Sequence, residues 1–401
     1  MVKSMLLTIC LAIIIVIAYW LLLPRKWRSL FLLLCSFVFI AIFNLIYAIY
    51  YMAMISAVYI AALLIKERPK NKHLILSASL ILLIGNLCFY KYFRVVIEFI
   101  TVYISEIIHL PAITIPQIVF PLGLSLITFR LVHYIIEAYR EKAPKASLVD
   151  FSLYVIFFPT FLAGPLERFP RFQEQTKAIG FINISEINYG LMRILLGIIK
   201  KFIIANSLYR VITPIIFSPQ DYSRAMLIVF IYLSAIWLYM ELSGYTDIAI
   251  GIARLFGYKI VENFNRPYLK KNIALFWRSW HISVYSWIRD YFYFPLFVYR
   301  GSRIKLYVGI FCTMLVFMLW HRGSWGFFFA GLYHGAGLII WNIFQESKKR
   351  FPLLRQLVNH KYLDSLSIFI TFNFVAFSIG IPFFGRDLTH IKAITVKLIG
   401  G

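Results

Sequence analysis

The chain has 401 residues, of which 61% are hydrophobic and 14% charged, and its mean hydropathy is +0.79. Soluble globular chains have roughly 45–50% apolar and about 25% charged residues, so this composition excludes a water-soluble fold. Lysine and arginine outnumber aspartate and glutamate by 41 to 17, which gives a net charge of +24. On a membrane protein this excess indicates cytoplasmic anchoring, contact with membrane lipid and attraction for an acidic protein partner. We expect no nucleic-acid binding, because the basic residues are scattered between apolar runs.

The expected elements are membrane-spanning helices, since many apolar runs have the roughly 17–25 residues needed to cross about 30 Å of hydrocarbon. Segment 5–23 is predicted to be a retained span rather than a signal peptide, because the basic segment 25–28 follows it as a stop signal. Segment 30–65 is too long for one crossing and predicts two helices with a tight turn near Asn44. Further apolar runs are 73–90, 95–109, 118–139, 151–164, 188–208, 224–256, 304–320, 325–344 and 365–385. The fold class expected is all-α integral membrane, with about 10–12 transmembrane helices.

Three segments interrupt the hydropathy pattern. The first, 157–169, reads Phe-Phe-Pro-Thr-Phe-Leu-Ala-Gly-Pro-Leu-Glu-Arg-Phe. Proline removes a backbone donor and bends a helix. Two interpretations remain open: a kinked helix end at the interface, or a re-entrant segment facing a cavity, where irregular backbone is tolerated.

The second interruption is the polar, aromatic segment 262–303. Read as one helix, it places Trp277, Trp280, His281, Val284, Ile288 and Tyr291 on one stripe, and Arg278, Tyr285 and Arg289 on another. An amphipathic helix at the interface would account for this pattern, with arginine reaching the headgroups. His281 lies among the tryptophans rather than on the basic stripe, which favours the alternative that the segment lines a cavity.

The third interruption is His321, which stands between the apolar runs 304–320 and 325–344. A histidine at membrane depth costs free energy unless it faces a cavity or a partner, so it is a candidate functional residue. The alternative is a histidine satisfied by a neighbouring carbonyl. His334 is thirteen residues further on, about 140° away on a straight helix, and is expected to be structural or to support the residues that contact the substrate.

Five segments in order carry a family resemblance: Ser-Gly-Tyr-Thr-Asp at 243–247, Glu-Asn-Phe-Asn at 262–265, Trp-Arg-Ser-Trp-His-Ile-Ser at 277–283, Arg-Asp-Tyr at 289–291 and Leu-Trp-His at 319–321. Over residues 110–345 the chain resembles the membrane-bound O-acyltransferase family. Within that family it is similar to the bacterial branch of alginate O-acetyltransferases, peptidoglycan O-acetyltransferases and teichoic-acid D-alanyltransferases. The resemblance implies helices with re-entrant segments around a central funnel, with His321 as the catalytic histidine and His281 accompanying it.

The evidence for a subgroup is divided. Segments 243–247 and 262–265 are similar to the acetylating members, whereas segments 157–169 and 331–335 are more similar to the D-alanylating ones. Acetyl is slightly preferred. The chain departs from the family pattern at Arg322, where the family usually has glycine.

The chemistry follows from transfer of an acyl group to a hydroxyl. A base must take the alcohol proton, and imidazole, with an ordinary pKa near 6.5, suits this at neutral pH. No serine or cysteine stands beside His321 in a nucleophile motif, so we expect direct attack by the acceptor. An acyl-enzyme on an extracytoplasmic partner acyltransferase stays open.

The expected donor is a cytoplasmic acyl thioester, either acyl-CoA or the phosphopantetheine of an acidic acyl carrier protein, and no bound cofactor or metal is expected. The acceptor is a cell-envelope polysaccharide or related polymer. Besides His321 and His281, the predicted donor-tunnel residues are Trp277, Trp280, Arg278, Asn263, Arg289, Asp290, Trp320 and His334. Arg278, Arg289 and Asp290 are expected either to form a buried ionic set or to contact the donor's phosphate. A transporter and a non-catalytic scaffold are the alternatives.

We expect one polytopic domain over 1–401 in the plasma (inner) membrane. It would comprise N-terminal helices in 1–109, a catalytic core in 110–345 and C-terminal helices in 346–401.

Loop charge also predicts the orientation of the chain. The basic clusters 25–28 and 66–72 flank two crossings, so both are expected on the cytoplasmic side and the N-terminus outside. A reporter fused within 66–72 should therefore be cytoplasmic, and one near residue 2 external. Labelling of the 66–72 loop from outside intact cells would contradict this orientation.

Overall fold

The computed structural model describes residues 14–108, 119–297, 302–352, 362–384 and 396–397. The structure is 83% helical and no strand occurs in these ranges. Seven of its helices are long and apolar enough to cross a membrane, which confirms an all-α integral membrane protein. The other predicted crossings fall on shorter or bent helices, or partly outside the described ranges, as segment 5–23 does.

The chain divides into two compact units, and the partition expected at 109/110 and 345/346 stays a prediction. The first comprises Met1–Leu196 and Thr246–Val261, and the second Gly197–Tyr245 and Glu262–Gly401. The stretch 184–217 and helix α11 (Arg224–Leu255) both pass from one unit into the other.

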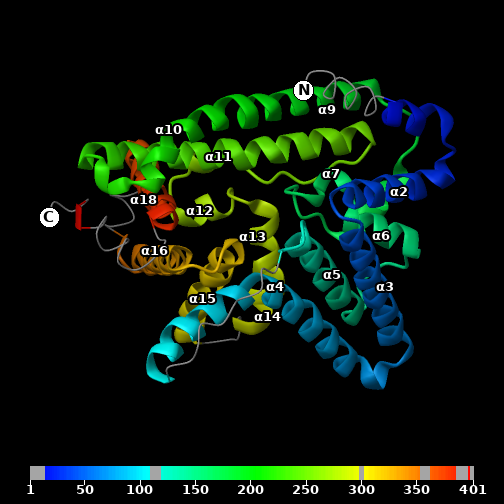
Figure 1. Cartoon of the computed structure of the whole chain (residues 1–401), viewed down its shortest axis with the longest axis horizontal. Coiled ribbons are helices and arrows are strands. Elements are labelled where there is room, and N and C mark those ends of the chain that lie inside the picture. The colour runs from blue at the N-terminus through cyan, green and yellow to red at the C-terminus, as the bar shows by residue number, and fades with distance from the viewer. Residues whose placement is uncertain (1–13, 109–118, 298–301, 353–361, 385–395, 398–401) are drawn as a thin grey trace. The chain divides into compact units, whose positions relative to one another are not determined.

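The first unit contains the helices drawn from blue to green in Figure 1. They are α2 (Arg25–Phe43), α3 (Leu45–Glu67), α4 (Lys72–Ile108), α5 (Leu124–Tyr139), α6 (Leu148–Ile156), α7 (Phe158–Phe161), α8 (Phe169–Ala178) and most of α9 (Ile184–Ile198), with short turns η1 (Ala18–Leu22) and η2 (Pro69–Asn71). Helix α3 lies against α5 and α2 against α6.

The predicted turn near Asn44 is confirmed. Asn44 has an extended backbone (φ −165°), and its side chain accepts a hydrogen bond from the Tyr47 amide at 3.2 Å. An asparagine in this position satisfies one of the free amides at a helix start, so α3 can begin immediately after α2 ends.

The prediction of separate helices over 73–90 and 95–109 is wrong, because α4 is continuous over both. No proline or glycine lies between the two apolar runs, so the charged residues there do not break the helix. The ammonium of Lys91 lies 3.5 Å from the hydroxyl of Ser125 on α5, which gives the charge a polar neighbour.

The segment 157–169 is an irregular, buried connection. Helix α6 ends at Ile156, α7 is one turn long, and the chain is then non-helical as far as α8. The guanidinium of Arg130, only 1% exposed, donates to the carbonyls of Tyr154 (3.2 Å), Val155 (2.7 Å) and Thr160 (3.2 Å), and to the Thr160 hydroxyl (2.7 Å). One side chain on α5 thus supplies donors to the carbonyls that the broken helix leaves without partners.

Further side chains hold the start of α8. The Nε2 atom of His133 accepts a hydrogen bond from the Phe169 amide at 3.1 Å. The buried carboxylate of Glu167 accepts from the amides of Arg168 (3.0 Å) and Val261 (3.2 Å). The irregular backbone therefore has partners inside the first unit.

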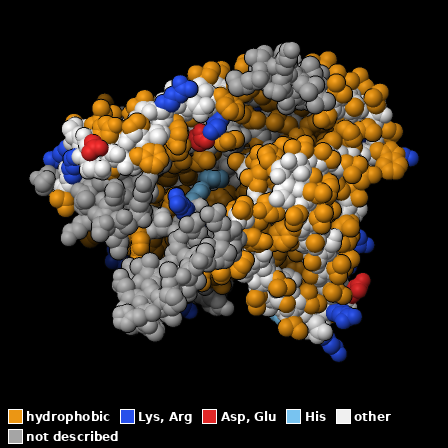
Figure 2. Space-filling model, viewed as in Figure 1, with side chains coloured by type: hydrophobic (Ala, Val, Ile, Leu, Met, Phe, Trp, Pro, Cys, Tyr) orange, Lys and Arg blue, Asp and Glu red, His pale blue; other side chains and the backbone are white. Residues whose placement is uncertain are grey.

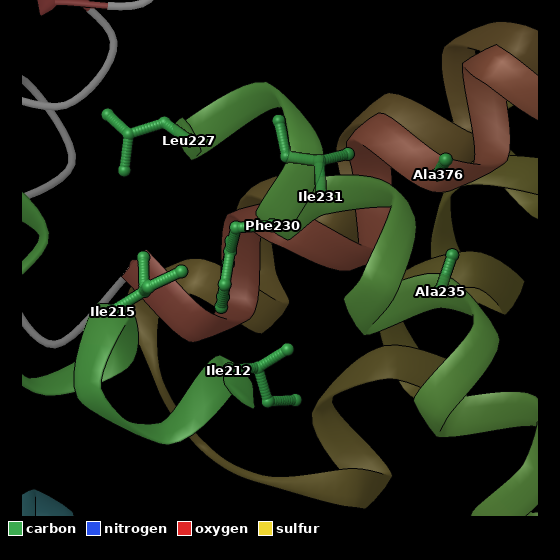
Figure 3. Packing of buried hydrophobic residues seen from close by; sticks show 7 residues of the cluster. All are labelled: Ile212, Ile215, Leu227, Phe230, Ile231, Ala235 and Ala376. Atoms are coloured by element: carbon green, nitrogen blue, oxygen red, sulfur yellow. The ribbon is translucent and has the colours of Figure 1, made fainter. Parts of the chain in front are cut away.

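The second unit contains η3 (Ile199–Ala205), α10 (Asn206–Phe217), η4 (Pro219–Asp221), the first part of α11, η5 (Pro267–Leu269), α12 (Ile273–Trp277), α13 (Ile282–Ile288), η6 (Arg289–Tyr293), α14 (Phe294–Phe297), α15 (Arg303–His321), α16 (Trp325–Arg350) and α18 (Leu363–Phe384). Figure 3 shows part of its core, in which side chains of α10, α11 and α18 pack together. The buried members are Ile212, Ile215, Leu227, Phe230, Ile231, Ala235 and Ala376.

Apolar side chains also cover much of the surface, as the orange atoms of Figure 2 show for one face. Exposed examples on the long helices are Ile42, Ile46, Leu74, Ile81, Ile304 and Phe369. Monomeric soluble proteins rarely expose contiguous apolar patches larger than a few hundred Å². Hydrocarbon contact accounts for these residues, in agreement with the hydropathy of the helices.

Arg130 gives the first structural prediction. Substitution Arg130→Gln should lower the free energy of unfolding by about 3 kcal/mol or more, because several buried carbonyls lose their donors. Thermal denaturation followed by size-exclusion chromatography in detergent measures the effect. The matched control is Arg140→Gln, whose exposed ion pair with Glu137 (3.2 Å) should contribute under about 1 kcal/mol. Equal melting temperatures for both variants would contradict the role assigned to Arg130.

Candidate active site

The segment 262–303 is not one helix, and the predicted pair of stripes is wrong. Helix α12 ends at Trp277, and α13 begins at Ile282. Between them His281 has φ 48° and ψ 46°, a left-handed conformation that few non-glycine residues adopt. The turn changes the direction of the chain, so side chains before and after it no longer follow a single helical periodicity.

Asn263 holds this turn in place. Its side-chain oxygen accepts hydrogen bonds from the amide (3.1 Å) and the hydroxyl (2.7 Å) of Ser283. Its backbone carbonyl accepts from the Ile282 amide at 2.9 Å. Asn263 is 1% exposed. It thus accepts hydrogen bonds from the first turn of α13, although it lies almost twenty residues earlier in the sequence.

The turn brings the two predicted catalytic histidines together. His321 is the last residue of α15 and is exposed, whereas His281 is buried. Their ring centroids lie 6.0 Å apart. Trp320 lies beside both, with ring centroids 6.0 Å from His281 and 4.5 Å from His321. The two imidazoles and the Trp320 ring thus form one cluster.

His281 is a neutral imidazole with a free polar atom. Burial lowers its pKa from the ordinary 6.5 to about 4, so the ring carries no charge at neutral pH. Its Nδ1 atom has no hydrogen-bond partner among the described residues, and the same holds for the indole nitrogen of Trp277. These two buried atoms remain available to a polar group that enters the site.

The side chains of Trp277 and Trp280 are buried and packed against neighbouring residues. Trp277 is 1% exposed and Trp280 5% exposed. The Trp280 ring stacks on Phe276 (5.6 Å) and Tyr268 (5.7 Å). Direct contact of either tryptophan with the donor stays a prediction.

His334 lies on a different helix from His321. The chain leaves helical geometry at Arg322, so the straight helix assumed for the angle between the two histidines does not exist. The Nε2 atom of His334 lies 2.7 Å from the hydroxyl of Ser378, which itself donates to the Val375 carbonyl at 2.6 Å. His334 therefore donates through Nε2 and ties α16 to α18.

Arg278, Arg289 and Asp290 do not form the expected buried ionic set. Arg278 is exposed. Arg289 and Asp290 form an ion pair of 2.8 Å, with side chains 44% and 33% exposed. The turn after α12 leaves Arg278 exposed, so the three side chains do not form a buried set. Contact with a donor phosphate stays a prediction.

One further feature of the site was not predicted. Phe317 lies beside both histidines, with ring centroids 6.2 Å from His281 and 5.6 Å from His321. Its place four residues before His321 on α15 is the sequence signal that could have identified it. Arg322, where the family usually has glycine, has φ −159°, so its backbone is extended and the larger side chain causes no strain.

Comparison with known proteins fits this arrangement. Residues 72–381 match MBOAT, the membrane-bound O-acyltransferase family. The chain belongs to the membrane-bound O-acyltransferase family. It is 32% identical over 326 residues to the protein of Azotobacter vinelandii named "Probable alginate O-acetylase AlgI", a match that covers 79% of this chain and 64% of that protein. It thus spans less than two thirds of that relative.

Two other relatives carry different names. The teichoic acid D-alanyltransferase of Bacillus subtilis is 31% identical over 286 residues, 67% of this chain and 70% of that protein. The peptidoglycan O-acetyltransferase of Helicobacter pylori is 28% identical over 392 residues, 88% of this chain and 69% of that protein. The family contains enzymes named for acetyl and for D-alanyl transfer, so membership does not select one acyl group.

The Asn263 clamp gives a second structural prediction. Substitution Asn263→Ala should lower the free energy of unfolding by about 1–3 kcal/mol, because the Ser283 amide and hydroxyl both lose their acceptor. Substitution Ser283→Ala removes only the hydroxyl bond and should cost about 0.5–1.5 kcal/mol. Thermal denaturation in detergent compares the two variants, and a larger loss for Ser283→Ala would contradict this account of the turn.

Proposed function

We propose that this chain is a membrane O-acyltransferase that moves an acetyl or D-alanyl group from a cytoplasmic thioester to a hydroxyl of an extracytoplasmic cell-envelope polymer. The observation that carries the proposal is the pairing of an exposed histidine, His321, with a buried neutral one, His281, at a ring separation of 6.0 Å. Membership of the family, and the names of its relatives, support the same reaction.

His321 acts as the general base. The acceptor oxygen attacks the thioester carbonyl carbon while His321 takes the hydroxyl proton. The new carbon–oxygen bond forms, the carbon–sulfur bond breaks, and the proton passes from His321 to the departing thiolate. Because His321 is exposed, an acceptor can reach its ring without prior unpacking of the helices.

His281 orients the donor. A buried imidazole that stays uncharged can hydrogen-bond to the thioester without repelling or attracting the anionic parts of its carrier. Its unpartnered Nδ1 atom can donate or accept according to the tautomer, and the indole N–H of Trp277 can donate. With these roles, substitution of His321 should reduce turnover more than substitution of His281.

The proposal also includes the acyl donor and the membrane in which the enzyme lies. The donor is acyl-CoA or an acidic carrier protein with phosphopantetheine, which the net charge of +24 would attract. The enzyme is placed in the inner membrane as a multi-pass protein, with an extracytoplasmic acyltransferase as a further partner if the acyl group passes through a second enzyme. Acetyl is slightly preferred because segments 243–247 and 262–265 are similar to the acetylating members.

The test measures acyl groups on the envelope polymer together with the amount of monodisperse protein extracted in detergent. Removal of a general base costs about 10²–10⁴-fold in rate, so His321→Ala and His321→Gln should abolish acylation at unchanged abundance. His281→Ala should reduce it by a smaller factor. The matched control is His73→Gln, since His73 is an exposed histidine outside the site that contacts Tyr139.

The two alternative classes give different results. Near-normal acylation per folded molecule in both His321 variants would refute the role of His321 as general base. The non-catalytic scaffold would then be the favoured alternative. A loss of abundance with normal specific activity would identify His321 as structural. Accumulation of an acylated intermediate that the variants fail to move across the membrane would indicate a transporter.

A further inference from the structure

A small basic pocket lies at the start of α2 in the first unit. It has a volume of about 240 Å³, and its lining includes Arg25, Lys26, Arg28, Ser29 and Lys177. A second hollow of about 410 Å³ shares lining residues with it, among them Arg25, Lys26 and Lys177. The proposed acyl transfer uses none of these residues.

The charge of this pocket is not balanced by the protein. Four cationic side chains meet there: Arg25, Lys26, Arg28 and Lys177. Among the residues that the structure describes, no carboxylate forms an ion pair with any of them. Asp150 lines the second hollow, where three of the four cations also lie, and accepts a hydrogen bond from Ser147 at 2.8 Å.

Arg28 is the strongest sign of a missing anion. Its side chain is 9% exposed and donates to the carbonyls of Gly180 (2.6 Å) and Trp20 (3.4 Å). Its Nε atom has no partner among the described residues. The Arg28 guanidinium also lies over the rings of Tyr19 (5.1 Å to the ring centre) and Trp20 (4.8 Å). These partners are neutral, and a bound anion would remove much of the cost of burying the cation.

The surroundings of the pocket place it at the level of lipid headgroups. Helix α2 is one of the helices apolar and long enough to span a membrane, and Arg25 is its first residue. Two aromatic residues beside the pocket are exposed, Trp27 by 50% and Phe181 by 85%. The Arg25 guanidinium lies 4.5 Å from the centre of the Phe181 ring. Aromatic and basic residues gather in this way where a span meets the headgroups.

We infer that this pocket binds the phosphate of an anionic phospholipid headgroup. Arg25, Lys26 and Lys177 surround the phosphate, and Arg28 neutralises it from the buried side. A volume of about 240 Å³ is below the roughly 300–1,000 Å³ of sites for drug-sized molecules, so it fits a headgroup better than a nucleotide. The exposed rings of Trp27 and Phe181 would contact the acyl chains.

The experiment is native mass spectrometry of the full chain in detergent, titrated with phosphatidylglycerol, phosphatidylcholine or coenzyme A. Phosphatidylglycerol should bind in preference to the zwitterionic lipid. The double variant Lys26→Gln/Lys177→Gln should weaken its binding by about 30-fold, and Lys177→Gln alone by about 5-fold, since each basic residue near the membrane surface contributes similarly.

The matched control is Lys70→Gln/Lys142→Gln, which makes the same charge change at two exposed lysines outside the pocket. It should leave the binding of phosphatidylglycerol within about 2-fold of the unmodified chain. Equal affinity for the two lipids, or equal losses in the two double variants, would overturn the site. If coenzyme A binding, and not lipid binding, depends on Lys26 and Lys177, the pocket holds a soluble phosphate and the lipid assignment is wrong.

Discussion

The fold depends on one constraint: a backbone amide or carbonyl that leaves helical geometry inside this apolar molecule has to find another partner. Arg130 meets the constraint in the first unit, where it donates to three carbonyls around the break between α6 and α7. Asn263 meets it in the second unit, where it accepts from the first residues of α13. Both sites use a buried polar side chain from a distant part of the sequence. The irregular segments are thus as well defined as the helices, and one of them positions His281.

The helices were the predictable part of the fold. Hydropathy runs identified α2, α3, α11, α15 and α16 because apolar length is a local property of the sequence. The turn at Asn44 was predictable for the same reason, since an N-cap acts on the next few residues. The left-handed turn at His281 was not, because it depends on hydrogen bonds from Asn263, which no periodicity within 277–291 reveals. A single helix was predicted over this segment because only its local periodicity was considered, and not its contacts with residues far away in the sequence.

The same distinction applies to the candidate site. The proximity of His281 and His321 followed from a resemblance in five ordered segments, which carries information about distant contacts that the residues alone do not. The resemblance did not predict which of the site's side chains are buried. The direction of each side chain around the turn decides that Trp280 is packed and Arg278 exposed, and that direction depends on the backbone conformation at His281. Residue type and spacing could therefore identify the members of the site but not their exposure.

The four hydrogen bonds of Arg130 have a consequence for how the protein is made. Its acceptors lie 24 to 30 residues later in the chain. At about 5–20 residues per second, ribosomes need roughly 1.5–6 s to synthesise that length. During this time α5 carries a cation without its final partners, and α5, with 16 residues, is not among the described helices that are long and apolar enough to span a membrane alone. Insertion of α5 should therefore wait for α6 and α7, so that the three helices leave the translocon together.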